Sequence, residues 1–210
     1  MDLATSAITG QVPMYSMEYG YVTTGAGALW QTDYESDALL RIDPVAGKVV
    51  ASIPVGLQPL GVAVTAGSVW VADEHSEAVT RVDPKTNRVV ATIPIGPAGP
   101  AGPQIMTAGP GGVWVGVPNM GEVVRIDSAR NRVGLVVPLD GWVASDGAQV
   151  WIGVDAGPNG PSKVVRIDPV SGKIITWVDL DTQGINGLAV GLGSVWVSAD
   201  GGTTRIDAAT

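Results

Sequence analysis

One motif repeats five times along the 210 residues of the chain. In each copy a Trp closes a hydrophobic run, a polar loop follows, and an Arg-hydrophobic-Asp triplet comes next. Successive arginines of the triplets are 40, 44, 41 and 39 residues apart. A repeat of this length indicates an array of one supersecondary unit, so the repeated residues should build the scaffold and the differing loops should carry function. The repeated residues are Trp30, Trp70, Trp114, Trp151 and Trp196, with Arg41, Arg81, Arg125, Arg166 and Arg205.

The clearest copy of the unit covers residues 59–96 and reads as four short strands. We expect these strands at Gly61–Thr65, Val69–Asp73, Ala78–Val82 and Arg88–Ile93. All four stretches are rich in Val, Ile and Thr, and none shows the 3.6-residue stripe of an amphipathic helix. Four strands in about 40–45 residues, with one Trp each, are typical of a β-propeller blade.

The two ends of the chain are complementary within this pattern. Residues 2–13 align without a gap on residues 83–94, so they read as the last strand of a unit. The fifth repeat stops at Thr210, where such a strand is due. We therefore predict an all-β, closed five-bladed β-propeller with four antiparallel strands per blade, in which residues 7–13 complete the last blade and remove its open edge. A parallel β-helix is the alternative fold.

The prediction places all of residues 1–210 in one domain. Its blades are expected at about 14–54, 55–95, 96–138, 139–180, and 181–210 together with 7–13. The five Trp side chains should fill the space between blades. Each Arg-x-Asp pair should form charge-assisted bonds that tie the third strand of a blade to the turn after it.

Several strings of the chain resemble YVTN-type propeller repeats and are similar to repeats of the streptogramin B lyase (virginiamycin B lyase) group. They are GSVWVAD (67–73), GSVWVSAD (193–200), RIDPVAGKVVASIPVG (41–56) and RVDPKTNRVVATIPIG (81–96). The resemblance covers essentially the whole chain and implies a propeller fold. It says less about activity, because this repeat class serves enzymes, sensors and scaffolds. The lyase group has seven blades.

Composition narrows the classes of partner. The net charge is −8, with 12 Lys and Arg against 20 Asp and Glu, which argues against nucleic acids and anionic membrane surfaces. No apolar run approaches the ~18 residues of a membrane span. We expect a monomer with a small-molecule or glycan ligand in a central funnel. The N-terminus has no secretory signal pattern, which predicts a cytoplasmic protein, or a secreted or periplasmic one if a leader has been removed.

The loops after each Trp and before each first strand should share one rim of the funnel, and many are acidic. Asp33, Asp73 and Glu74 are the candidate metal ligands. Oxygen-only ligands of this kind suit Mg²⁺ or Ca²⁺. The alternative is an acidic rim that is simply solvated.

The same loops contain aromatic and amide side chains that could bind a ligand. A pair of aromatic rings across a funnel can stack on a flat molecule or a sugar. The alternative is that these rings only plug the channel. The candidate ligand-binding residues are Tyr15, Glu18, Tyr21, Tyr34, Gln104, Trp142 and Asn186.

His75 is the only histidine of the chain and forms the pattern Trp-x-x-Asp-x-His with Trp70 and Asp73. This pattern looks like the Trp-x-x-Glu-x-His arrangement of the lyase group. The resemblance implies that His75 is a general base in an elimination, that Asp73 orients it or holds metal, and that Mg²⁺ polarises the substrate. The lyase group uses a further His, which this chain lacks.

Three functions are consistent with these residues. The first is a small-molecule-binding propeller with an acidic and aromatic mouth, acting as a divalent-metal-dependent lyase or hydrolase. The second is a non-catalytic ligand-binding or scaffold module. The third is a glycosidase that uses two rim carboxylates. Whether the chain is an enzyme is left open by the sequence.

Overall fold

The computed structural model describes residues 11–12, 20–96, 102–155, 157, 160–182 and 184–209. Within these residues the chain is all-β and forms five antiparallel sheets, four with four strands and one with three. Each sheet is made from consecutive strands, as the repeat predicts. Among the described residues, no helix is long and apolar enough to cross a membrane.

The strands follow one another in chain order within each sheet. The first sheet contains β1 (Val22–Gly25), β2 (Ala28–Asp33), β3 (Ala38–Asp43) and β4 (Lys48–Pro54). The second contains β5 (Pro59–Thr65), β6 (Ser68–Asp73), β7 (Ala78–Asp83) and β8 (Arg88–Pro94). The third contains β9 (Ile105–Gly109), β10 (Gly112–Val117), β11 (Glu122–Asp127) and β12 (Arg132–Val137).

The fourth sheet contains β13 (Trp142–Ser145), β14 (Val150–Val154), β15 (Lys163–Ile167) and β16 (Ile174–Asp179). The fifth contains β17 (Ile185–Gly191), β18 (Ser194–Ala199) and β19 (Gly202–Asp207). The described residues include two short 3₁₀ helices, both in loops between second and third strands. They are η1 (Glu74–Ser76) and η2 (Pro118–Met120).

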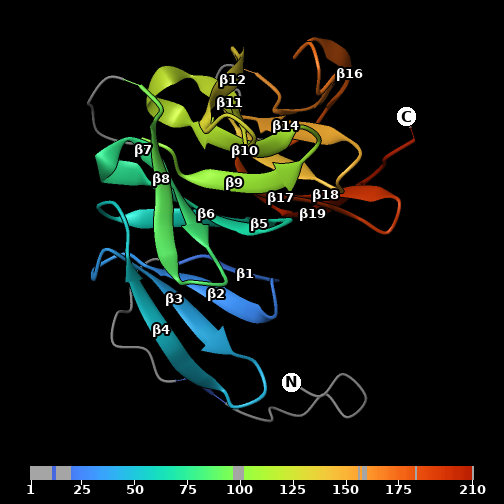
Figure 1. Cartoon of the computed structure of the whole chain (residues 1–210). Coiled ribbons are helices and arrows are strands. Elements are labelled where there is room, and N and C mark those ends of the chain that lie inside the picture. Colours follow the sequence, from blue (N-terminus) through green and yellow to red (C-terminus); the bar gives the residue numbers. More distant parts are fainter. Residues whose placement is uncertain are drawn as a thin grey trace.

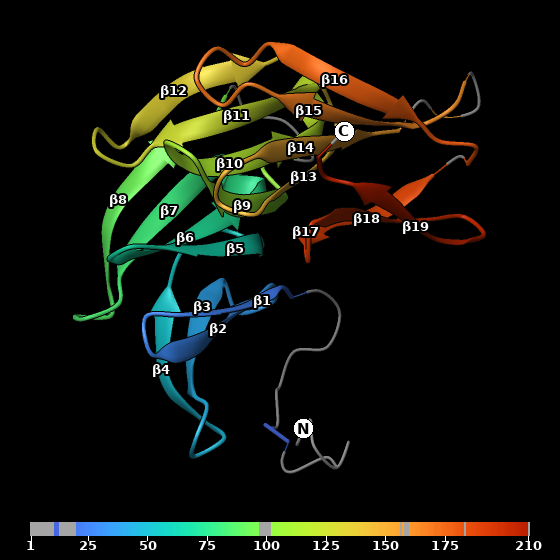
Figure 2. The same ribbon diagram turned by 90° about the vertical axis from the view of Figure 1, so that its right-hand side faces the viewer.

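The sheets are arranged side by side along an arc (Figure 1). The first strands of neighbouring sheets contact each other in the series β1, β5, β9, β13 and β17. Figure 2 shows these first strands nearest the middle of the arc and the fourth strands β4, β8, β12 and β16 on its outside. This order is expected when each unit buries both faces against its neighbours.

The core lies between adjacent sheets, and the repeated Trp residues fill it. Trp30, Trp70, Trp114 and Trp151 are 0% exposed. Trp30 packs with Val69 and Val71 of the second sheet, and Trp151 packs with Val195 and Val197 of the fifth. Trp196, in the last sheet, is only half-buried. The prediction that the Trp side chains fill the space between sheets is thus confirmed for the first four.

The repeated arginines stack on these Trp rings. Arg and Trp of the same repeat face each other across the second and third strands, as Arg41 faces Trp30. The guanidinium carbon lies 5.0–5.9 Å from the ring centroid in all five copies, within range of a cation–π interaction.

Arg41, Arg81 and Arg125 bond the turn of the next sheet, so the prediction that they bond their own turn is wrong for these three. Arg41 Nη1 donates to the Pro84 carbonyl and to Asn87 Oδ1, both at 2.9 Å. Arg81 Nη1 donates to the Ser128 carbonyl at 2.9 Å and to Asn131 Oδ1 at 2.7 Å. An Arg side chain on the face of the third strand extends across the space between two sheets. Its guanidinium group therefore meets the turn of the next sheet and not its own turn.

The Asp of each triplet closes its own turn, as predicted. Asp43 Oδ1 accepts hydrogen bonds from the N–H groups of Val45 and Ala46 at 2.8 and 3.0 Å. These bonds lower the pKa of Asp43 below its usual value. Asp83, Asp127, Asp168 and Asp207 make the same kind of bond to the N–H two residues on. The pattern is an Asx turn.

The predicted closing strand falls mostly outside the described residues. Residues 7–10 and 13 are not among them, and Gln11 and Val12 are described but lie in no strand. The fifth sheet accordingly has three strands within the described part of the chain.

Candidate functional site

Residues of the five first strands line one cavity, which we call the central cavity. Its volume is about 370 Å³. It is lined by side chains from all five of these strands and by Tyr21, which precedes β1, among them Val22, Val62, Met106, Val143 and Leu188. The lining is about equally polar and apolar, because Thr23, Thr107 and Ser145 lie in it beside these aliphatic side chains.

Two aromatic residues predicted to bind ligand, Tyr21 and Trp142, both line the central cavity. Tyr21 is 39% exposed, and burial of its phenol raises its pKa. Its backbone N–H donates to Thr32 Oγ1 at 2.9 Å, which fixes the residue beside β2. The structure therefore brings together side chains that are 121 positions apart in the sequence.

A second cavity, which we call the mouth cavity, adjoins the central one because Ile105 and Trp142 line both. Its volume is about 210 Å³. Its polar lining consists of Gln104, Asp140 and Asp155, which come from three different loops. The amide Gln104 and the ring of Trp142 thus meet as the sequence predicts.

The two carboxyl groups of the mouth cavity have opposite environments. Burial raises the pKa of Asp140 above its ordinary value. Hydrogen bonds lower the pKa of Asp155, above all the one from the Gly157 N–H at 2.9 Å, with Ser162 Oγ donating at 3.1 Å. Such a pair can provide a proton donor and a proton acceptor in one site.

Gly141, between Asp140 and Trp142, is required by close packing. A Cβ at this position would overlap the carbonyl oxygen of Gly153 on β14. The backbone of the loop can therefore lie against β14, with Asp140 and Trp142 on either side of the contact.

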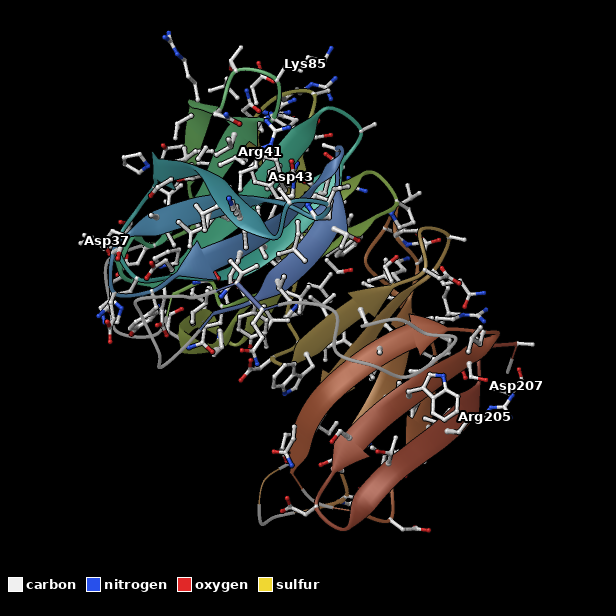
Figure 3. The ribbon with its side chains drawn as sticks, turned by 90° about the horizontal axis from the view of Figure 1, so that it is seen from below. Asp37, Arg41, Asp43, Lys85, Arg205 and Asp207 are labelled. Carbon is white, nitrogen blue, oxygen red and sulfur yellow. The ribbon has the colours of Figure 1, made fainter. Side chains whose placement is uncertain are left out.

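A third cavity, of about 450 Å³, lies between loops of the first and second sheets. We call it the His75 cavity. It is lined by Tyr34, Glu35, Asp37, Leu57, Gln58 and His75. Figure 3 shows Asp37 at the opposite end of the first sheet from Arg41 and Asp43, so this cavity and the Asp turns lie on different rims.

His75 lies on η1 and is held by backbone bonds to the loop before β5. Its N–H donates to the Leu57 carbonyl at 3.2 Å, and the Glu74 N–H donates to the Gln58 carbonyl at 3.2 Å. The His75 side chain is 46% exposed, and its Nδ1 is 3.7 Å from Glu74 Oε2. The structure therefore pairs the His75 imidazole with the carboxylate of Glu74. The sequence had predicted Asp73 as its partner.

Asp73 is 0% exposed at the end of β6. Thr80 Oγ1 donates to Asp73 Oδ2 at 2.5 Å, and Asp73 Oδ1 has no hydrogen-bond partner among the described residues. Burial raises the pKa of Asp73 from 3.8 to about 7, and bonds from Thr80 and Gly56 oppose the rise, while the charge of Asp37 adds to it. Gly56 is required beside it, since a Cβ there would lie 2.6 Å from the Asp73 Cγ.

The predicted metal ligands do not gather at one point. Asp33 Oδ1 accepts from the Ser36 N–H at 3.3 Å, Asp73 bonds Thr80, and Glu74 Oε1 accepts from Gln104 Nε2 at 2.6 Å. Across the described ranges no group of three His, Cys, Asp or Glu side chains is placed to hold a metal ion. The residues named from sequence therefore do not fit a Mg²⁺ or Ca²⁺ site, and the metal stays a prediction without a ligand set.

Three residues predicted to bind ligand, Tyr15, Glu18 and Asn186, are not among the described residues that line these cavities. Tyr15 and Glu18 lie outside the described residues. Asn186 Nδ2 donates to Asp200 Oδ1 at 3.2 Å, and neither residue lines the three cavities described above.

Sequence reasoning missed Gln58 and Thr80, and it did not connect Asp37 with His75. These contacts form between loops of adjacent sheets or across one sheet, and no local pattern marks them. The one available signal was the Asp three positions after Trp, which occurs only as Asp33 and Asp73 in the five copies.

Comparisons with known proteins agree on the fold. No protein-family model matches the sequence, and no curated protein matches it. A chain of the Kuenenia stuttgartiensis hydrazine synthase is similar in structure, with a TM-score of 0.71 and 16% identity, over 89% of this chain and 65% of that one. The computationally designed Ika8 protein is similar with a TM-score of 0.67 and 12% identity, over 89% of this chain and 57% of that one.

This chain thus spans about two thirds or less of the length of those solved chains. At such low identity the likeness shows the fold alone, which is a β-propeller-like array of antiparallel sheets. In all, 989 solved chains are similar, so the fold is too widespread to indicate an activity.

Proposed function

We propose that this protein is a small-molecule-binding β-propeller whose ligand occupies the central cavity and its mouth. The observation that carries the proposal is that all five sheets line one cavity, and that this cavity shares Ile105 and Trp142 with a second cavity lined by polar side chains. Ligand sites are concave and mostly apolar, with a few polar groups that orient the ligand. The mouth cavity has this composition, with Gln104, Asp140 and Asp155 as the polar groups, and the central cavity adds Thr23, Thr107 and Ser145 to its apolar residues.

The chemistry of the lining favours a flat or ring-shaped molecule that has hydrogen-bond donors. Tyr21 and Trp142 offer aromatic faces for stacking. The carboxyl groups of Asp140 and Asp155 accept hydrogen bonds from hydroxyl or N–H groups, and they disfavour an anionic ligand. A glycan or glycoside meets both requirements.

The test uses p-nitrophenyl glycosides as probes, with binding followed by saturation-transfer NMR. We expect transfer to the sugar and aryl protons in the wild-type protein and its loss in Trp142→Ala. Trp177→Ala is the matched control, because Trp177 is 56% exposed on the outer strand β16. Equal transfer in both variants, or none in the wild type with any glycoside of the panel, would refute the site.

A second function, glycoside hydrolysis, is favoured by the opposite environments of Asp140 and Asp155. In this reaction Asp140, whose pKa is raised by burial, would act in its protonated form and donate its proton to the leaving oxygen as the glycosidic C–O bond breaks. The ionised Asp155 takes a proton from the attacking water, so that one water is consumed. Release of p-nitrophenol by the wild type, lost in Asp140→Asn and kept in Asp179→Asn, would support it. Binding without release leaves the non-catalytic module as the function.

A lyase function, implied by the resemblance to streptogramin B lyase repeats, is supported by fewer features of the protein. His75 is exposed in its own cavity and could act as a base. No group of metal ligands stands beside it in the described part of the chain. The resemblance therefore supports the repeat class more than the activity.

We further propose that the propeller is closed and has five blades, with residues 7–13 as the fourth strand of the last sheet. In the aligned repeats Val12 corresponds to Ile93, and the outer strands bury an apolar side chain there, as Ile53 and Ile93 show at 4% and 3% exposure. Val12→Asp should therefore lower the melting temperature sharply, whereas Val45→Asp, at a position 95% exposed, should not. Equal melting temperatures would argue against closure.

A further inference from the structure

The two ends of the strands form two rims of different charge. Successive strands of each sheet are antiparallel, so the turns between first and second strands and between third and fourth strands share one end. We call this end the turn rim, and the other end the opposite rim. The turns of neighbouring sheets lie together, because Arg41, Arg81 and Arg125 each bond the turn of the next sheet. Figure 3 shows Arg41 and Lys85 toward one end and Asp37 at the other.

Nearly all the positive charge of the chain lies at the turn rim. Of the 12 Lys and Arg residues, 11 lie in these turns or in the adjoining halves of the strands, and Lys163 alone lies at the opposite rim. Six Asp residues share the turn rim, which gives it a formal net charge of +5. The opposite rim has 12 described Asp and Glu residues against Lys163, a formal net charge of −11. Asp2 and Glu18, outside the described residues, complete the total of −8.

The two rims are far enough apart to act separately on a partner. A six-residue strand such as β6 is about 20 Å long. The Debye length is about 8 Å at physiological ionic strength, so charges at this separation are largely screened from each other. A surface that touches the turn rim therefore meets mainly the positive charge, and the net charge of −8 does not exclude an anionic partner there.

The second observation is a set of apolar side chains at the tips of these turns. Val45, Leu192 and Val170 are 95%, 94% and 78% exposed, which makes them the most exposed large apolar side chains among the described residues. They lie between β3 and β4, between β17 and β18, and between β15 and β16, so all three belong to the turn rim. The fold does not require them, since the second repeat has Ala66 in place of Leu192 and Lys85 in place of Val45.

We propose that the turn rim is a peripheral binding surface for an anionic lipid bilayer. The basic side chains attract the phosphate headgroups, and the apolar tips enter the boundary between the headgroups and the acyl chains. A nucleic acid or another soluble polyanion would use the positive charge but would leave the three apolar tips in water. The exposed basic side chains at this rim include Lys48, Lys85, Arg88, Arg132 and Lys173.

This orientation leaves the mouth cavity open to solution. The polar residues of the mouth cavity, Gln104, Asp140 and Asp155, all lie in loops of the opposite rim. A bilayer at the turn rim would therefore lie at the far end of the strands from these residues. A second copy of the chain that used its acidic rim as the partner would instead cover its own mouth cavity.

The test is sedimentation of the full chain with sucrose-loaded vesicles, made of phosphatidylcholine alone or of phosphatidylcholine and phosphatidylglycerol in equal parts. We expect the protein to sediment with the mixed vesicles at about 0.1 M NaCl and to stay in solution with phosphatidylcholine alone. Binding should weaken at least about tenfold at about 1 M NaCl, because the Debye length falls from about 10 to about 3 Å. No binding to the mixed vesicles, or equal binding to both kinds, would overturn the proposal.

Two pairs of variants locate the surface. Lys85→Gln should weaken binding to the mixed vesicles about fivefold, which corresponds to about 1 kcal/mol for one Lys near an anionic surface. Lys163→Gln removes the same charge from the opposite rim and should bind as the wild type does. Leu192→Ala should also weaken binding about fivefold, because less apolar surface enters the bilayer. Its control is Leu57→Ala, at a position 53% exposed on the opposite rim.

The other occupants give different results. Equal vesicle affinity of Lys85→Gln and Lys163→Gln would mean that the turn rim is not the surface. Binding that depends on Lys85 but not on Leu192 would indicate a site for soluble polyanions and would overturn the bilayer as partner. Self-association in sedimentation equilibrium without vesicles, weakened by Lys85→Gln and accompanied by no vesicle binding, would identify a second copy of the chain as the partner instead.

Discussion

Replacing Asp73 by Asn should remove one specific pH dependence from the stability of the protein. Asp73 is 0% exposed, and one of its oxygens has no hydrogen-bond partner among the described residues. The ionised form is therefore poorly solvated, and burial raises its pKa to about 7. Asn has the size of the protonated acid and no charge at any pH.

The sign and size follow from linkage. Below the unfolded-state pKa of 3.8, the Asp73 carboxyl is protonated in both the folded and the unfolded state, so it does not lower the free energy of unfolding. Between 3.8 and about 7 the unfolded chain releases the proton while the folded chain keeps it, so stability falls as pH rises. Above about pH 7 the free energy of unfolding has fallen by its full amount, which is about 4 kcal/mol.

Urea unfolding followed by Trp fluorescence, from pH 4 to pH 8.5, measures this. We expect Asp73→Asn to be close to the wild type at pH 4 and more stable than it at pH 8, by up to about 4 kcal/mol. The difference between the two proteins should grow with pH at about 1.4 kcal/mol per unit in the middle of the range.

The control is Asp43→Asn. Hydrogen bonds from Ala46 and Val45 lower the pKa of Asp43, so its carboxylate is ionised in both states above about pH 5. The difference in free energy of unfolding between Asp43→Asn and the wild type should therefore be constant between pH 5 and pH 8. If Asp73→Asn also gave a constant difference, or lost stability as pH rose, the reasoning that Asp73 is kept neutral by burial would be refuted.

Two further predictions concern packing. Gly56→Ala should lower the free energy of unfolding by about 1–3 kcal/mol, because the new Cβ overlaps the Asp73 side chain; Gly191→Ala has nothing within 4 Å of its Cβ and should change it by under about 0.5 kcal/mol. Trp30→Phe should cost about 1 kcal/mol more than Trp151→Phe. The reason is that Trp30 Nε1 donates to the Gly25 carbonyl at 3.0 Å, whereas Trp151 Nε1 is buried without a partner in the described structure. Urea unfolding of each variant measures all four, and equal costs within either pair would contradict the argument.

The strands of the repeat could be located from sequence to within two residues. The predicted strand Gly61–Thr65 is observed as Pro59–Thr65, and Arg88–Ile93 is observed as Arg88–Pro94. This worked because side-chain alternation and turn residues are local signals, and five copies of the same pattern reinforce each other. The burial of Trp30, Trp70, Trp114 and Trp151 followed from the same repetition.

The partners of the repeated Arg residues could not be read in this way. An Arg near an Asp in the sequence suggests a local pair, yet Arg41 reaches Pro84 and Arg81 reaches Ser128 in the next sheet. These bonds depend on the spacing and angle between sheets. The pKa of Asp73 depends likewise on the packing of Gly56 against it.

The sequence also predicted which residues are candidates for a site, but not which of them lie together. The sequence identified Tyr21, Gln104 and Trp142 by type and by their loops, and the structure brings them to two adjoining cavities. It also named His75 with Asp73, but the structure exposes one and buries the other. Asp73 is the last residue of β6 and His75 lies on η1, so the change from strand to helix separates the two side chains despite their spacing in the sequence.

By itself, the sequence determined the repeating unit, the strand positions, the turn-closing Asp residues and the Trp core, because all of these depend on contacts within about forty residues. Only the tertiary structure decided which loops face one another, which carboxyl groups lose water and which buried acceptor, such as Gln58 Oε1, has no donor among the described residues. Those properties depend on how neighbouring sheets pack, and loop side chains that differ between copies carry no periodic signal of it.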